Sequence, residues 1–89
     1  MVTEYKLVLT RSAVKDKEKI KMIPALKRNV DKLLNIIRKN PFQNPPPYEK
    51  LSGNFKELYS RRINRQHRLV YKVTGDTVII VSMWTHYEF

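Results

Sequence analysis

The chain has 89 residues, with 18 Lys and Arg against 8 Asp and Glu, no Cys and a formal net charge of +10. This length predicts one domain, residues 1–89, with a thin core, and the absence of cysteine excludes disulfide frameworks, thiolate zinc sites and cysteine nucleophiles. No apolar run could span a bilayer and the first residues lack the apolar h-region of a signal peptide, so we expect a small soluble domain in the cytoplasm. The positive charge favours a polyanionic partner: nucleic acid, a ribosome, an anionic membrane surface or an acidic protein.

The N-terminal part of the chain predicts a strand followed by a helix. Residues 5–10 are rich in β-forming side chains and alternate imperfectly, as strands do. A helix is expected to follow Ser12, its N-cap, and to run through Val14 to about Met22. Its lysines are expected to form a solvated basic surface, made of Lys15, Lys17, Lys19 and Lys21.

A second helix is predicted to begin at Pro24. Proline lacks an N–H and suits a first helical turn, so it begins a new helix here instead of continuing the previous one. Apolar residues recur at helical spacing and form one stripe that should face a sheet: Leu26, Val30, Leu33, Leu34 and Ile37. The pair Asn40-Pro41 ends this helix.

The remaining half of the chain predicts a loop and three strands. The loop covers Pro41 to Gly53 and is stiffened by the three prolines at 45–47. Runs of β-formers follow at 58–63, 66–73 and about 77–84, and the turn at 74–76 joins the last two as a hairpin. The order β-α-α-β-β-β predicts an α+β fold, in which a mainly antiparallel sheet packs against a helical hairpin.

The runs at 58–63 and 66–73 would form a hairpin that is rich in cations. Between Tyr59 and Lys72 there is no acidic residue, and the cations are Arg61, Arg62, Arg65, Arg68 and Lys72. A three-residue loop at 64–66 would place Arg62 opposite Arg68 and keep Ile63 on the apolar face, whereas a two-residue loop would place Arg61 opposite Arg68. Two opposed arginines repel, so the pair favours a bound anion between them. A basic strand surface that only faces water is the alternative.

Three residues are candidates for proton transfer. Glu49 is one of two carboxylates between Lys32 and Gly75, and it is either an ion-pair partner of the arginines or a general base. His67 falls on the apolar side of its strand, which favours a structural role. His86 is either an exposed histidine near the chain end or a proton donor. We predict no metal site, because the two histidines and the scattered acids do not form a ligand set.

These residues fit RNA cleavage without a metal ion. RNA carries its own nucleophile, the 2′-hydroxyl, so cleavage needs a base, cations for the charge on the pentacoordinate phosphate, and an acid for the departing 5′-oxygen. Glu49, Arg62 with Arg68, and His86 would supply these three functions. DNA lacks the 2′-hydroxyl and should not be cleaved.

The chain resembles the YoeB/Txe toxins of bacterial toxin–antitoxin systems, which belong to the RelE superfamily. The similarity is carried by EKL at 49–51, YSRRI at 59–63, QHRLVY at 66–71 and HY at 86–87. It implies a RelE-like fold, with Glu49 as general base and His86 as general acid. It further implies that Arg62 and Arg68 contact the phosphate and that Tyr87 is the family's C-terminal tyrosine.

The resemblance also implies an activity and partners. The expected activity is metal- and cofactor-free cleavage of mRNA in the A site of the 70S ribosome, and the expected partner is a YefM/Axe-like antitoxin with a disordered segment that folds on binding. A toxin homodimer is a further expectation, and no membrane partner is implied. The residues expected to contact RNA or the ribosome are Lys15, Lys17, Lys19, Lys21, Lys50, Arg61 and Arg65. Two alternatives are a gyrase inhibitor like the ParE relatives and a ribosome- or RNA-binding module without catalysis.

Overall fold

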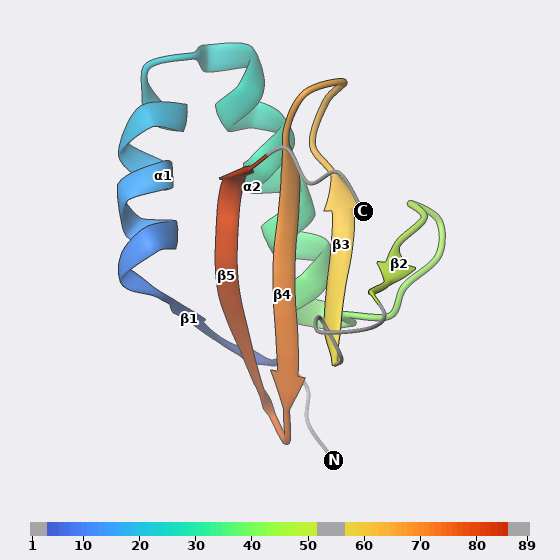
Figure 1. Cartoon of the computed structure of the whole chain (residues 1–89). Helices are drawn as coiled ribbons and strands as arrows, with labels where there is room; N and C mark the ends of the chain where they lie inside the picture. The colour runs from blue at the N-terminus through green and yellow to red at the C-terminus, as the bar shows by residue number, and fades with distance from the viewer. Residues whose placement is uncertain (1–3, 52–56, 86–89) are drawn as a thin grey trace.

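The structure, a computed structural model, describes residues 4–51 and 57–85 (Figure 1). The elements along the chain are β1 (Lys6–Leu9), α1 (Arg11–Lys21), α2 (Pro24–Lys39), β2 (Glu49–Lys50), β3 (Leu58–Arg62), β4 (Arg68–Thr74) and β5 (Thr77–Thr85). The prediction of an α+β fold is therefore confirmed. Within these described ranges, no helix combines the length and apolar character that crossing a membrane would require.

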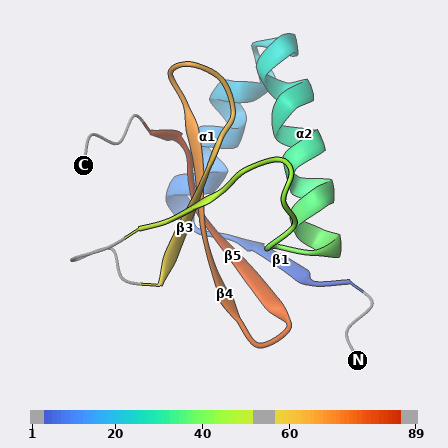
Figure 2. The same cartoon turned by 90° about the vertical axis from the view of Figure 1, so that its right-hand side faces the viewer.

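The strands form one sheet in the order β1-β5-β4-β3-β2. Strand β1 pairs in parallel with β5, whereas the other neighbouring strands pair antiparallel, so the predicted mainly antiparallel sheet is confirmed. Helix α1 lies beside β5 at one side of the sheet, and β2 forms the opposite edge (Figure 1). In the turned view, α2 stands to one side of the strands (Figure 2).

Helix α1 begins earlier than the sequence indicates. Thr10 is its N-cap, because the Thr10 Oγ1 accepts a hydrogen bond of 3.1 Å from the Ala13 N–H, so the prediction of Ser12 as cap was wrong. The same hydroxyl donates to the Val81 carbonyl at 2.8 Å. This second bond, to a strand 71 residues away, selects Thr10 over its neighbour and ties the helix start to β5.

Helix α2 follows its predicted pattern. Pro24 occupies the first turn, and the helix runs to Lys39, one residue before the predicted stop at Asn40-Pro41. Leu34 of the predicted stripe is partly buried, and the other four members are buried: Leu26, Val30, Leu33 and Ile37. They pack with α1 and with the facing side of the sheet around one core. Its other members include Ile63, directly after β3, and the strand residues Leu69, Tyr71, Val78, Ile80 and Met83.

The β4–β5 hairpin closes with a two-residue turn and then becomes irregular. Gly75 has φ +60° between the paired Thr74 and Thr77, the arrangement of a turn with glycine at its first central position. Further along, the register between β4 and β5 shifts twice. The Asp16 carboxylate of α1 accepts a hydrogen bond of 3.0 Å from the Met83 N–H in this irregular stretch, so a helix side chain satisfies a buried strand donor.

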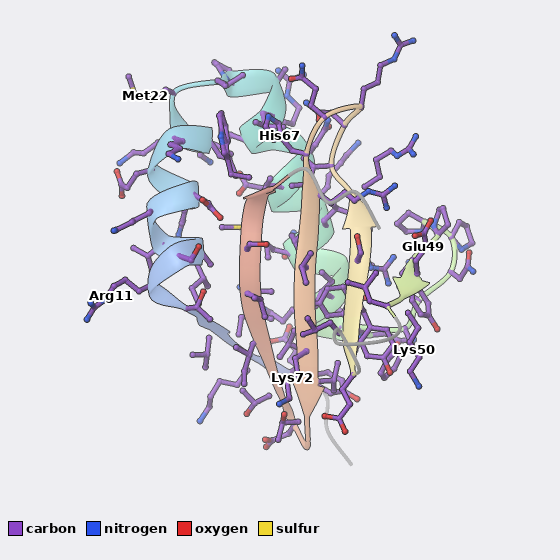
Figure 3. All side chains as sticks on the ribbon, viewed as in Figure 1. Arg11, Met22, Glu49, Lys50, His67 and Lys72 are labelled. Carbon is purple, nitrogen blue, oxygen red and sulfur yellow. The ribbon has the colours of Figure 1, made fainter. Side chains whose placement is uncertain are left out.

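The predicted loop from Pro41 to Gly53 contains a short strand that the sequence did not indicate. Glu49 and Lys50 of β2 pair with Ser60 and Tyr59 of β3. The loop before β2 includes cis peptide bonds preceding Pro45 and Pro46. This pairing places Glu49 on the sheet itself, at the edge far from α1 (Figure 3).

Candidate active site

The arginine hairpin has the register that the longer loop predicts. Arg62 lies directly opposite Arg68, and the Ile63 N–H donates to the His67 carbonyl at 2.9 Å. The loop at 64–66 is held by the Asn64 side chain, whose Oδ1 accepts hydrogen bonds of 2.8 and 2.7 Å from two following backbone N–H groups. The prediction of opposed arginines is therefore confirmed, and the two cations share the sheet face that points away from the helices.

Glu49 joins this arginine pair at a small cavity. The Glu49 Oε2 lies 3.6 Å from the Arg68 Nη1, and 66% of the Glu49 side chain is exposed against 24% of Arg68. A cavity of about 230 Å³ opens here, lined by Pro47, Tyr48, Glu49, Ser60, Arg62 and Arg68. An exposed pair at this distance contributes little to stability, so the carboxylate remains accessible to a ligand.

Ser60 lies at the floor of this cavity and was not predicted as a site residue. It pairs with Glu49 across the β2–β3 ladder. It is 1% exposed, and its hydroxyl has no hydrogen-bond partner among the residues that the structure describes. The sequence could have indicated this residue, because the alternation of side chains along a strand puts Ser60 on the same face as Arg62.

Arg61 points to the other face of the sheet and is 1% exposed. Its guanidinium donates to the carbonyls of Pro41 (3.0 Å), Gln43 (2.8 Å) and Pro46 (2.7 Å), and its Nε donates to the Tyr71 hydroxyl at 3.2 Å. The expectation that Arg61 contacts RNA or the ribosome is wrong for this structure, because the guanidinium is enclosed and already bonded. Burial raises the pKa of the Tyr71 phenol, and the neighbouring cation offsets part of that rise.

His67 has the structural role that its position predicted. Its Nδ1 lies 2.9 Å from the Trp84 carbonyl, and its ring stacks on the Trp84 ring at 4.3 Å between centroids. The Lys19 ammonium lies 5.6 Å from the centre of the Trp84 ring, which adds a cation–π contact from α1. His67 and Asp16 thus hold the far part of β5, next to the strand end that pairs with Arg68.

The other predicted site residues are spread over the surface. Helix α1 lies at the opposite side of the sheet from β2, which carries Glu49 (Figure 1). Four of its lysines are exposed: Lys15, Lys17, Lys19 and Lys21. Lys50 is exposed on β2, and Arg65 is exposed in the hairpin loop. His86 and Tyr87 lie outside the described residues. The structure therefore brings together Glu49, Arg62 and Arg68, and no lysine among the described residues lines the cavity that they share.

A larger hollow of about 730 Å³ lies between the two helices and β1. Apolar side chains and lysine stems line most of it, and the Asp31 carboxylate is already paired with the Lys27 ammonium at 2.7 Å. It has no arginine pair, so the smaller cavity is the better candidate for anion chemistry. Across residues 4–51 and 57–85, no three His, Cys, Asp or Glu side chains gather where they could hold a metal ion.

Comparison with solved structures gives the same fold. A YoeB/ParE toxin from Agrobacterium tumefaciens aligns with a TM-score of 0.84 at 28% identity, covering 92% of this chain and 99% of that one. The YoeB-YefM complex from Staphylococcus aureus contains a chain with a TM-score of 0.81 at 30% identity, and the match covers 93% and 98% of the two chains. A YoeB dimer from Staphylococcus aureus aligns equally well, with a TM-score of 0.82.

Sequence comparison agrees with the structural one. Toxin YoeB of Escherichia coli strain K12 is 37% identical over 60 residues, which cover 67% of this chain and 71% of that protein. Toxin YoeB of Escherichia coli O6:H1 strain CFT073 is 42% identical over 64 residues, covering 68% and 76%. The family model for the YoeB-like toxin of bacterial type II toxin–antitoxin systems matches residues 12–87. The chain therefore belongs to this family of toxins.

Proposed function

We propose that this chain is a ribosome-dependent endoribonuclease that cleaves mRNA in the A site and so inhibits translation. The observation that carries the proposal is the pairing of Arg62 with Arg68 on the open sheet face, with the Glu49 carboxylate 3.6 Å from the Arg68 guanidinium. Opposed cations destabilise a strand pair, so their placement is best explained by an anionic ligand between them. Membership of the toxin family supports the same activity.

The proposed reaction uses the 2′-hydroxyl of the substrate as nucleophile. Glu49 accepts the proton of this hydroxyl while the 2′-oxygen forms a bond to phosphorus. Arg62 and Arg68 stabilise the additional negative charge of the pentacoordinate phosphate. The bond between phosphorus and the 5′-oxygen then breaks, which leaves a 2′,3′-cyclic phosphate and, after proton transfer, a 5′-hydroxyl.

We assign the proton donor for the leaving 5′-oxygen to His86. The support for this assignment is proximity along the chain, because Thr85, the residue before it, is in register with Arg68 at the end of β5. An imidazole can give a proton at neutral pH, as this step requires. Tyr87, the next residue, is proposed as a further contact to the substrate. DNA has no 2′-hydroxyl, so the same residues should leave it intact.

The proposal includes partners. One solved relative from Staphylococcus aureus is a complex with YefM and another is a dimer, which supports a YefM-like antitoxin and a toxin homodimer for this chain. Six exposed cations that do not line the cavity are proposed to contact ribosomal RNA or mRNA: Lys15, Lys17, Lys19, Lys21, Lys50 and Arg65. Binding through them should weaken steeply with salt concentration.

Mapping mRNA 5′ ends in a reconstituted translation reaction, with and without ribosomes, tests the proposal. The wild-type protein should create new 5′ ends only when ribosomes are present. Glu49→Gln, Arg68→Met and His86→Ala should each reduce cleavage by about 100-fold or more. The control Arg28→Met removes an exposed arginine of α2 and should cleave like the wild type.

Two outcomes would contradict the proposed cleavage, and a third would contradict the assigned catalytic roles. DNA damage on expression, without new mRNA 5′ ends, would identify a gyrase inhibitor. Salt-dependent ribosome binding without any cut ends would identify a binding module. Full cleavage by both Glu49→Gln and His86→Ala would remove the proposed acid–base roles even if cleavage itself were observed.

A further inference from the structure

A buried arginine with no carboxylate beside it is unusual, and Arg61 is such a residue within the described part of the chain. Its charge is compensated by the carbonyl oxygens of Pro41, Gln43 and Pro46, at 2.7 to 3.0 Å. The Tyr71 hydroxyl accepts from the Arg61 Nε and itself donates to the Pro41 carbonyl at 2.7 Å. Burying a charge is costly unless it is hydrogen-bonded in this way. The guanidinium therefore needs the loop carbonyls as acceptors, and these carbonyls need the guanidinium as their donor.

All three carbonyls belong to the loop that leads into β2. This loop has little support of its own, because β2 has only two residues and forms two register pairs with β3. The guanidinium also lies 5.1 Å from the centre of the Tyr48 ring, and Tyr48 directly precedes Glu49. Its ring contacts those of Phe42 and Tyr59 at 6.0 and 5.9 Å between centroids. The guanidinium thus contacts the loop at several points, from Pro41 at its start to Tyr48, the residue before Glu49.

We propose that Arg61 is a positioning residue for Glu49. By fixing the loop at 41–48, it holds the Glu49 carboxylate beside Arg68 on the opposite face of the sheet, although it touches no substrate itself. The catalytic part of this inference rests on the proposed function; the structural part, a clamp on the loop, does not.

Only an arginine can form this clamp. The planar guanidinium directs several N–H groups along fixed directions and reaches three carbonyls and one hydroxyl together. A lysine ammonium is a single point and cannot span Pro41 and Pro46 in the same way. Arg61→Lys should therefore fail to rescue function despite keeping the charge.

The experiment has a structural arm and a kinetic arm on the full chain. Amide hydrogen exchange at residues 48–50 should accelerate about 10-fold or more in Arg61→Met, measured relative to the amides of Leu69 and Ile80 in the core strands. The maximal rate of ribosome-dependent cleavage should fall by about 100-fold, while the KM for programmed ribosomes stays within about 2-fold. Arg28→Met loses the same charge from an exposed site and should match the wild type in both arms.

Tyr71→Phe serves as the milder variant if Arg61→Met does not fold. It keeps the ring, removes the shared hydroxyl and should change both readouts in the same direction by about 3-fold to 10-fold.

Wild-type exchange at 48–50 in the folded Arg61 or Tyr71 variant overturns the clamp. A raised KM with an unchanged maximal rate also overturns the inference, because it would mean that Arg61 binds the ribosome. If the wild-type protein does not cleave mRNA, the proposed function fails, and the exchange arm still decides the clamp.

Discussion

Arg61 and Arg62 are neighbours in the sequence and face opposite sides of one sheet. Arg61 is enclosed and donates to three loop carbonyls and a tyrosine, whereas Arg62 is exposed and faces a second arginine. The first charge therefore stabilises the fold, and the second is held in an arrangement that costs stability and suits an anion. The pair shows that a residue's chemistry is decided by the sheet face on which it lies, more than by its position in a basic run.

The largest expected effect is on folding, through Arg61. Arg61→Met removes the donors of three loop carbonyls and should lower the free energy of unfolding by about 3 kcal/mol, which corresponds to a fall in Tm of about 15 °C. Thermal unfolding followed by circular dichroism measures it. A loss no greater than that of Arg28→Met would remove the contrast between the two faces.

A slightly smaller effect is expected on catalysis, through Arg62. Arg62→Met should slow ribosome-dependent cleavage by about 100-fold, equivalent to about 2.7 kcal/mol of lost transition-state stabilisation, while the protein stays fully folded. Single-turnover cleavage on programmed ribosomes measures it. If cleavage persists at the wild-type rate, the anion between the arginines is not the scissile phosphate.

The Tyr71 hydroxyl should contribute about 1 kcal/mol, and its contribution depends on pH. Burial raises the pKa of Tyr71 above 10.0, so the phenol holds its proton more tightly in the folded protein than in the unfolded chain. Stability from this group is complete below pH 10 and is lost as the pH rises through the folded-state pKa. Urea titrations at several pH values should therefore show a steeper decline above pH 10 in the wild type than in Tyr71→Phe.

The smallest effect has the opposite sign. Arg62→Met relieves the repulsion with Arg68 and should raise the free energy of unfolding by about 0.5 kcal/mol. Urea titration at low ionic strength is the suitable measurement, and the gain should shrink in 0.5 M salt. A destabilised Arg62→Met protein would show that the exposed arginine contributes to the fold after all.

Much of this contrast could be predicted from the alternation of side chains between the two faces of a strand. The loop at 64–66 fixes Arg62 opposite Arg68, and the apolar stripe of α2 indicates which face is covered. The same alternation places Arg61 and Ile63 together on the covered face, but a charged arginine is usually exposed, which favoured the opposite prediction. Its partners are backbone carbonyls, which carry no signature in the sequence, so the burial of Arg61 could not be foreseen.

Two local features were hidden for related reasons. Strand β2 has only two residues and follows a proline-rich stretch, so it has no periodicity to detect. The choice of Thr10 over Ser12 as helix cap depends on the hydrogen bond to Val81, a contact made only in the folded protein. Local propensity favours either residue, and the tertiary contact decides.

The sheet order has a consequence for when this protein folds. Strand β5 is the last of the described strands along the chain, yet it lies between β1 and β4, and β1 has no other neighbour in the described sheet. Strand β1 can therefore pair with β5 only after residues 77–85 have been synthesised and have left the ribosomal exit tunnel. During its own synthesis the chain therefore cannot assemble the complete sheet, and folding finishes only after residues 77–85 are free to pair with both neighbouring strands.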